Sequence, residues 1–331
     1  MTVTHLLVGP RPHGVVRFGW DLYGSMRAGG FDVGRQWTAH HGIASRPLRA
    51  DAIHLQFTDR LFGDSPEDAA EKVASLAAGA RGTTTATLHD VPQPSDGKNF
   101  ARRTDAYAAV SAACRGVVVS SHHERELLRD CGIEPLHLTV IPLPVGPPTC
   151  APATCGGDRT VGVFGYIYPG KGHAEVLAAL PESGGVEMLA IGETSLGHDD
   201  VAINLQACAQ RKGVTFRVTG YVADSQVPAV LRRVAVPVVA HRHISASGSI
   251  NSWLSAGRRP LAPTHRYTVE FEERNPGSLT LYPDTAAGLR SAIEYALATP
   301  ESTWLAAGTV LSPAPEHVAR LYAEFFADCH R

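Results

Sequence analysis

The amino-acid sequence predicts an α/β fold with two doubly wound, Rossmann-like domains and a final helix that returns to the first domain. Three observations lead to this prediction. Short apolar segments that suit buried parallel strands alternate with segments of helical periodicity along most of the chain. Residues 142–158 contain five Pro and three Gly without a strand or helix period, which is typical of a linker. The length of 331 residues also fits two domains of average size.

The first series of elements precedes the linker. The expected strands are 3–8, 52–57, 83–88, 116–119 and 138–141, and the expected helices are 15–28, 69–78, 101–113 and one that Ser120-Ser121 cap. We therefore expect residues 1–145 to form the first domain.

The second series follows the linker, and we expect residues 146–312 to form the second domain. Its strands are expected near 161–164, 186–191, 214–219, 235–239, 260–262 and 278–281, with helices between them. From Pro315 onwards the apolar residues Val318, Leu321, Tyr322, Phe325 and Phe326 recur at helical spacing. This stripe has to be buried, so we expect residues 313–331 to pack back on the first domain.

Charge and cysteine content narrow the function classes. The formal net charge of −2 gives no electrostatic reason to expect nucleic acid or an anionic membrane as partner. No apolar run approaches the ~20 residues of a membrane span. The six Cys form neither a C-x-x-C pair nor a cluster with zinc spacing, so we expect no metal site and no cofactor. The N-terminus has no signal-peptide pattern, which predicts a cytoplasmic protein; a homo-oligomer stays open.

One stretch, residues 160–180, combines a strand, a tight turn and a helix. Val161 to Phe164 form a buried-strand pattern, Gly165 ends it, and residues 169–172 make a turn that contains Lys171. A lysine and backbone N–H groups beyond the carboxyl end of a parallel strand are typical of an anion site, most often a phosphate site. The alternative is an ordinary strand-to-helix turn with a solvated lysine.

Several short segments, taken in order, resemble a known family. They are His13-Gly14, Thr87-Leu88-His89-Asp90, Val118-Val119-Ser120-Ser121, Val140-Ile141-Pro142, Gly165 with Lys171-Gly172, Thr219-Gly220-Tyr221-Val222, and Ser247-Gly248-Ser249 leading to Ala256-Gly257-Arg258-Arg259-Pro260. Their order over residues 5–265 is similar to that of glycosyltransferase family 4, whose members have the GT-B architecture of two Rossmann-like domains facing a cleft. The resemblance implies a retaining, metal-independent transfer of a sugar from a nucleoside diphosphate to an acceptor. The short chain and the lack of a basic or amphipathic membrane-docking helix favour a small soluble acceptor over a lipid.

The same resemblance suggests roles for individual residues. For the donor it points to Gly14 in the first domain and, in the second domain, to Tyr166, Lys171, Gly220, Tyr221, Val222, Arg242, His243, Ser247, Gly248, Ser249 and Ser252. The resemblance gives His89, Asp90 and Lys171 as catalytic residues, with Asp90 as a hydrogen-bond partner of His89. For the acceptor, the first helix and the loop after Phe57 offer His13, Arg17, Trp20, Asp21 and Asp59. Each acceptor residue taken singly can also be an ordinary surface residue.

The chain departs from the family pattern at three positions. Tyr166 replaces the usual Arg after the glycine, and Arg242 is a candidate to restore its charge. The usual pair of Glu residues falls on Ile244 and Ser252. Two alternatives therefore stay open: another chemistry on the same fold, such as sugar-nucleotide epimerisation or pseudo-glycosidic coupling, and a two-lobed nucleotide-binding protein without catalysis.

Overall fold

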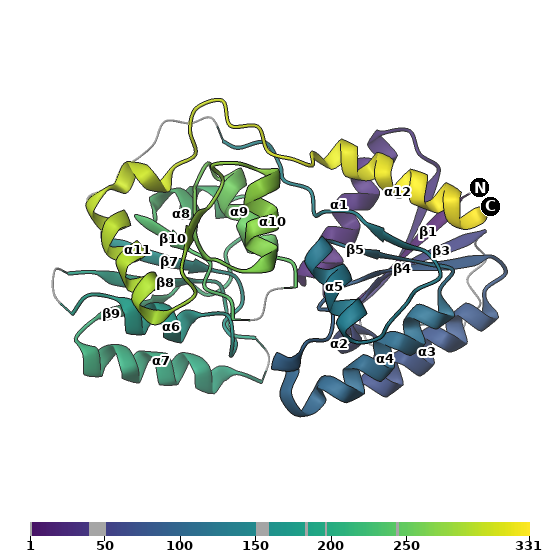
Figure 1. Ribbon diagram of the computed structural model, residues 1–331, viewed down its shortest axis with the longest axis horizontal. Coiled ribbons are helices and arrows are strands. Elements are labelled where there is room, and N and C mark those ends of the chain that lie inside the picture. Colours follow the sequence, from purple (N-terminus) through teal and green to yellow (C-terminus); the bar gives the residue numbers. More distant parts are fainter. Residues whose placement is uncertain (1, 40–50, 150–158, 183–184, 196, 243–244) are drawn as a thin grey trace. The chain divides into compact units, whose positions relative to one another are not determined.

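The computed structural model describes residues 2–39, 51–149, 159–182, 185–195, 197–242 and 245–331. The chain divides into two compact units, one of residues 1–144 with 313–331 and the other of residues 145–312 (Figure 1). Each unit has an α/β fold around a parallel sheet of six strands, as the sequence predicts. Among the described helices none is both long and apolar enough to cross a membrane.

The first unit is built on a sheet with the strand order β2-β1-β3-β4-β5-β6, in which every pair is parallel. The strands are β1 (Val3–Val8), β2 (Val33–Thr38), β3 (Ala52–Phe57), β4 (Thr83–Leu88), β5 (Gly116–Val119) and β6 (Leu138–Val140). The helices are α1 (Gly14–Ala28), α2 (Asp59–Phe62), α3 (Pro66–Gly79), α4 (Phe100–Ala113), α5 (His122–Asp130) and α12 (Pro315–His330), with a short 3₁₀ segment at Pro94–Asn99.

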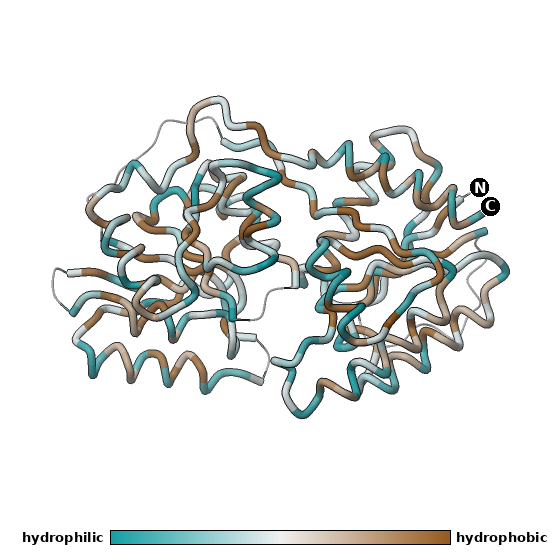
Figure 2. Tube along the Cα trace, viewed as in Figure 1, coloured by the Kyte–Doolittle hydropathy of each residue, from teal (hydrophilic) through white to brown (hydrophobic). Residues whose placement is uncertain are grey.

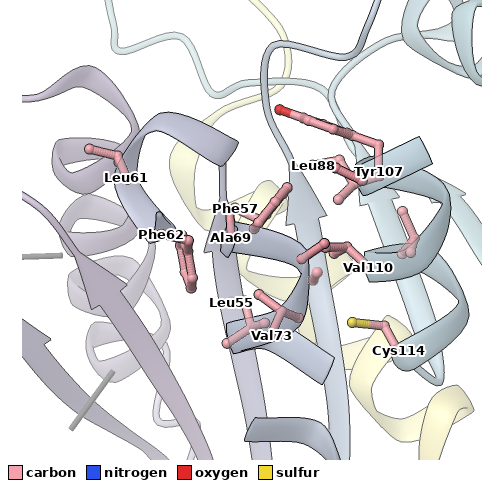
Figure 3. Close-up of a cluster of buried hydrophobic side chains, with 14 of the residues drawn as sticks. Leu55, Phe57, Leu61, Phe62, Ala69, Val73, Leu88, Tyr107, Val110 and Cys114 are labelled. Atoms are coloured by element: carbon pink, nitrogen blue, oxygen red, sulfur yellow. The ribbon is translucent and has the colours of Figure 1, made fainter. Parts of the chain in front are cut away.

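The two faces of this sheet are covered by different helices. One face packs against α2, α3, α4 and α5, and Figure 3 shows part of that core, where Phe57 lies between Phe62 and Tyr107. The other face packs against α1 and α12. Figure 2 shows hydrophobic residues concentrated on the strands of this unit, whereas the outer sides of the helices are polar.

Helix α12 closes the first unit, as the sequence analysis expects. Val318, Tyr322, Phe325 and Phe326 are buried, and Leu321 is partly buried at the margin of the same cluster. The Tyr322 hydroxyl lies 2.8 Å from the Thr87 hydroxyl of β4. The start of β1 and the end of α12 lie side by side in this unit (Figure 1).

Strand β2 was not among the expected elements. It lies at the edge of the sheet, where only Val33 is buried and Arg35, Gln36 and Trp37 are exposed. An edge strand whose side chains are mostly exposed lacks the apolar run by which buried strands are recognised in a sequence. The other five strands of this unit lie within one or two residues of their expected positions.

The second unit has the strand order β12-β11-β10-β7-β8-β9, again all parallel. Its strands are β7 (Thr160–Phe164), β8 (Glu187–Ile191), β9 (Thr215–Val218), β10 (Val236–Val238), β11 (Leu261–Pro263) and β12 (Thr280–Tyr282). Its helices are α6 (His173–Ala179), α7 (Asp199–Lys212), α8 (Val227–Arg233), α9 (Gly248–Ser255), α10 (Arg266–Arg274) and α11 (Ala286–Ala298), with a 3₁₀ turn at Pro300–Thr303.

In the second sheet, the direction in which successive strands are added reverses between the neighbouring strands β7 and β10. From β7 the chain proceeds outward to β8 and β9, and from β10 it proceeds in the opposite direction to β11 and β12. Helices α6, α7 and α11 cover one face, and α8, α9 and α10 cover the other. In open α/β sheets ligands bind beyond the carboxyl ends of the strands at such a reversal. The loops after β7 and β10 are therefore the place to look for a site.

Candidate functional site

Lys171 lies at the reversal point of the second sheet, in the loop between β7 and α6. Its side chain is 7% exposed, and Nζ lies 3.4 Å from the hydroxyl of Ser249 on α9. Nζ also lies against the backbone of Gly165, where an added Cβ would be only 2.9 Å away. Within the described ranges no carboxylate pairs with this ammonium group. Burial lowers the pKa of Lys171 to about 7, because the charged form is poorly solvated.

Two histidines share this environment, and neither was singled out in the sequence. His173 is 2% exposed, and both of its ring nitrogens lack a hydrogen-bond partner in the described part of the chain. Burial and the neighbouring Lys171 lower the pKa of His173 to about 3. The pKa of His241 is lowered well below its usual value by desolvation first, then by Lys171 and His173. Three basic side chains thus gather here without a described counter-charge.

The loops that carry these residues are held together by close backbone contact. Gly172 has a φ of +95°, and a Cβ at this position would lie 2.0 Å from the carbonyl oxygen of Ala240. The backbone N–H of Arg242 donates to the carbonyl of Gly170 at 3.0 Å. Glycine is the residue that tolerates both this backbone conformation and this approach. The glycine at position 172 is therefore explained by the contact between the two loops.

Helix α9 brings hydroxyl groups and free amides to the same place. Ser247 is its N-cap, with Oγ accepting from the N–H of Ile250 at 3.4 Å and lying 3.0 Å from the Ser249 hydroxyl. The amides of Gly248 and Ser249 have no acceptor among the residues described. An added Cβ at Gly248 would meet nothing within 4 Å, so the space beside this residue is open. These groups can bind an anion together with Lys171.

The other predicted donor residues have less specific surroundings. Arg242 is exposed and forms an ion pair with Glu175 at 3.3 Å, and Ser252 donates its hydroxyl to the Gly248 carbonyl within the helix. Gly220, Tyr221 and Val222 follow β9; Tyr221 is 61% exposed, whereas Val222 packs on the core. Tyr166 directly follows Gly165 after β7. His243 and Ile244 lie outside the described residues.

In the first unit, His89 follows β4 and is 8% exposed. Its Nε2 lies 2.9 Å from the side-chain oxygen of Gln56 on β3, and its ring packs edge-on against Phe18 of α1. Gln56, and not Asp90, is therefore the side-chain partner at this nitrogen. Burial and the nearby His13 lower the pKa of His89 to about 3, so the ring is neutral at physiological pH. A neutral imidazole can exchange hydrogen bonds with hydroxyl groups.

The loop that carries His89 is fixed by groups that the sequence analysis did not identify. The Tyr107 hydroxyl donates to the His89 carbonyl at 2.6 Å, and the Arg103 guanidinium donates to the Asp90 carbonyl at 2.7 Å. Asp90 has a φ of +52°, a left-handed backbone conformation that asparagine and aspartate adopt more readily than most residues. Its carboxylate accepts a hydrogen bond from Thr58 at 3.4 Å.

The predicted acceptor residues lie around the start of α1 and α2. Asp59 is buried and accepts two hydrogen bonds from Arg103, both of 3.1 Å, so its carboxylate is engaged within the protein. The His13 side chain caps α1 by accepting from the N–H of Val15 at 3.3 Å, and the next residue, Gly14, borders open space. Further along the helix, Arg17 and Asp21 are exposed and Trp20 is partly buried.

No protein-family model and no curated protein sequence matches the chain. Solved structures match it over nearly its whole length. HepE of Anabaena in complex with UDP-glucose has a TM-score of 0.79 at 16% identity, covering 99% of this chain and 100% of that one. A sucrose-phosphate synthase of Thermosynechococcus elongatus has a TM-score of 0.75 at 14% identity, with coverages of 99% and 100%.

A third structure, a glycosyltransferase of Rickettsia africae, has a TM-score of 0.67 at 11% identity and covers 99% of this chain and 98% of that one. At such identities the likeness establishes the fold. The chain has the fold of GT-B glycosyltransferases, with two Rossmann-like α/β domains and a C-terminal helix in the first.

Proposed function

We propose that the chain is a glycosyltransferase that takes its sugar from a UDP-sugar and transfers it to a small soluble acceptor with retention of configuration, as in glycosyltransferase family 4. The observation that carries the proposal is the buried cation at the reversal point of the second sheet. Lys171 has no described counter-charge, and His173 beside it has no described hydrogen-bond partner. Unsatisfied buried groups of this kind are costly, and a diphosphate would satisfy them.

The anion proposed for this place is the diphosphate of the donor. One phosphate would accept hydrogen bonds from Lys171, from the hydroxyls of Ser247 and Ser249, and from the first amides of α9. UDP is the nucleotide that HepE binds in its solved complexes, which is why we propose it first. Gly220 and Tyr221, beyond β9, are the candidates to contact the base.

In the proposed reaction the bond between the anomeric carbon and the diphosphate breaks, and the acceptor oxygen attacks the same face of the sugar. The acceptor proton passes to a phosphate oxygen of the leaving group. Lys171 would stabilise the charge that develops there, a role that a divalent ion has in other enzymes, so we propose that no metal is required. His89, neutral at pH 7, would hydrogen-bond a sugar hydroxyl and orient the ring without transferring a proton.

The experiment that tests the proposal begins with binding. Thermal unfolding is followed with UDP, ADP, GDP and several UDP-sugars, because a ligand at ~100 times its Kd stabilises the native state by roughly 2.7 kcal/mol. Stabilisation by UDP and a UDP-sugar, and its loss in Lys171→Met, is the expected result. No stabilisation by any nucleoside diphosphate would contradict the proposal.

The second stage follows turnover with the selected donor, a panel of small acceptors and EDTA in the buffer. A product with a new glycosidic bond, whose anomeric configuration by NMR equals that of the donor, is expected. Conversion of the donor without a new bond would indicate epimerisation or another chemistry on this fold. Binding without any turnover would indicate a nucleotide-binding protein, and activity that returns only with Mg²⁺ or Mn²⁺ would contradict the metal-free reaction.

A further inference from the structure

The turn that carries His89 contains a strained backbone position. Among the residues that the structure describes, Asp90 is the only one other than glycine with a positive φ, which is +52°. Residues with a Cβ atom adopt this conformation rarely, and it persists where the surrounding structure holds it. The contacts that hold Asp90 therefore bear on how the neighbouring His89 is presented.

Two donors on α4 hold the peptide groups on either side of Asp90. The Tyr107 hydroxyl lies 2.6 Å from the carbonyl oxygen of His89, and the Arg103 guanidinium donates to the carbonyl of Asp90 at 2.7 Å. Because peptide groups are planar, φ and ψ of Asp90 describe how these two planes are rotated relative to each other. The two donors thus hold the left-handed conformation from both sides.

His89 itself lies between two fixed peptide groups. Its backbone N–H donates to the carbonyl of Phe57 at 2.8 Å, because β3 and β4 are neighbours in register. Its own carbonyl is held by Tyr107. With both peptide planes fixed, the direction of its Cα–Cβ bond is fixed as well. The contacts of the ring with Gln56 and Phe18 then select how the imidazole is rotated about that bond.

The Tyr107 hydroxyl has a proton to donate and a clear acceptor for it. The side chain is fully buried, and burial first, then the Asp59 carboxylate, raise the pKa of Tyr107 well above its ordinary value. Asp59 lies 3.5 Å away, and Arg103 donates to the hydroxyl oxygen at 3.3 Å. The 2.6 Å contact with the His89 carbonyl is the short one, so the proton lies there.

Arg103 is held in turn by two carboxylates. Asp59 accepts from Nε and Nη2 at 3.1 Å each, and Asp96 accepts from Nη1 at 2.7 Å. The Arg103 side chain is only 12% exposed, so these two charges compensate it where solvation is poor. Asp96 also accepts from the backbone N–H of Gln93 at 3.0 Å. Asp59, which the sequence offered for the acceptor, thus serves to fix Arg103.

We propose that Tyr107 and Arg103 are positioning residues for His89. They hold the two carbonyl groups that set the turn, and through the turn they set the place of the imidazole. The proposal rests on the proposed function, in which His89 orients the donor sugar. It deepens that function by naming two residues of α4 that determine the orientation while acting through His89.

The first test needs no substrate. In the free full chain with ¹⁵N-labelled histidine, NMR records the imidazole signals of His89, which are identified by their loss in His89→Gln. These signals report the surroundings and hydrogen bonding of the ring, and they should shift in Tyr107→Phe. Arg103→Lys should shift them as well, since an ammonium group keeps the charge but cannot reproduce the planar fork that reaches both carboxylates and the Asp90 carbonyl.

The second test measures turnover with the UDP-sugar and acceptor that the screen above selects. Tyr107→Phe removes one hydroxyl and keeps the ring that packs on Phe57. Its kcat should fall about tenfold or more while the KM for the donor and the Kd for UDP stay unchanged, because orientation is lost and the diphosphate contacts are not. Arg103→Lys should lower kcat in the same way.

Tyr322→Phe is the matched control. It also removes a buried hydroxyl of the first unit, but one that contacts Thr87 and not the turn after β4. This variant should keep the His89 signals and the kcat of wild type. Thermal unfolding of all variants compares their losses of stability, so that an effect on folding is separated from an effect on the turn.

Unchanged His89 signals in Tyr107→Phe would overturn the proposal, and so would a kcat equal to that of wild type. An equal fall of kcat in Tyr322→Phe would assign the effect to the stability of the unit and would also overturn it. Failure of the proposed function is a separate result, because it would appear as absent turnover in wild type. The imidazole signals of the free chain would still decide whether α4 positions His89.

Discussion

Replacing Lys171 by Met should weaken UDP binding without disturbing the packing around the side chain. Methionine keeps an unbranched apolar stem of similar length, which suits a position that is 7% exposed. A charge-assisted hydrogen bond contributes about 1.5–3 kcal/mol, so the Kd for UDP should rise roughly 10- to 150-fold. Lys98→Met, which removes an exposed lysine of the first unit, is the matched control and should bind UDP as wild type does.

The pH dependence of the same binding gives a sharper test. Burial lowers the pKa of Lys171 to about 7 in the free protein, and only the protonated form attracts the diphosphate. Affinity for UDP should therefore fall as the pH rises through 7, by about fivefold between pH 7 and pH 8, and continue to fall towards the level of the Met variant. UDP itself changes little in this range, since a last phosphate pKa of about 6 leaves it roughly 90% ionised at pH 7 and almost fully ionised at pH 8.

Isothermal calorimetry at pH 7, 8 and 9 measures this dependence, and a pair of buffers with different ionisation enthalpies reports the protons taken up on binding. Wild type should take up a fraction of a proton at pH 7 and close to one at pH 8, whereas Lys171→Met should take up fewer and vary less with pH. An affinity for UDP that is the same at pH 7 and pH 9, or equal proton uptake in both proteins, would refute the placement of Lys171 at the diphosphate.

Three further changes test other parts of the structure. His89→Ala should lower turnover on the order of 100-fold while UDP affinity by calorimetry changes little, because orientation is lost and the diphosphate contacts are not; near-normal turnover would make His89 structural. Gly172→Ala should destabilise the chain by about 1–3 kcal/mol in urea unfolding, since a Cβ would lie 2.0 Å from the Ala240 carbonyl at a φ of +95°, and wild-type stability would disprove that contact. Phe326→Ala should lower the free energy of unfolding by about 3–5 kcal/mol, because the side chain is buried where α12 packs on the first sheet, whereas a loss below 1 kcal/mol would mean that α12 is loosely attached.

Much of the candidate site could be found from sequence because it depends on local patterns. A buried strand, a glycine and a Lys-Gly turn are contiguous, so the sequence predicted Lys171 as an anion-binding residue by its place after a strand. Ser247 was expected to open a helix for the same reason, and it is the N-cap of α9. The sequence did not reveal residues whose contacts join two elements that are distant along the chain. Gln56 contacts His89 only because β3 and β4 are neighbours in register.

Asp59 shows most clearly which contacts could not be predicted from the sequence. Its sequence position after a strand suggested a residue free for a ligand, whereas the fold brings Arg103, 44 positions later, onto its carboxylate. His173 had no signal in the sequence, because its lack of a partner is a property of the surrounding packing. Strand β2 was missed since an exposed edge needs no apolar run.

The sequence by itself determined the two series of strands and helices, the linker between them and the apolar stripe of the final helix. These features depend on the spacing of apolar residues within one segment of the chain. Only the tertiary structure decided which loops meet, which charges are neutralised and which stay without a partner. The reason is physical: solvation and hydrogen-bond satisfaction depend on everything that surrounds a group, and distant parts of the chain supply those surroundings. The burial of Lys171 is such a property, because Gly165 and Ser249, from distant parts of the second unit, lie against its side chain.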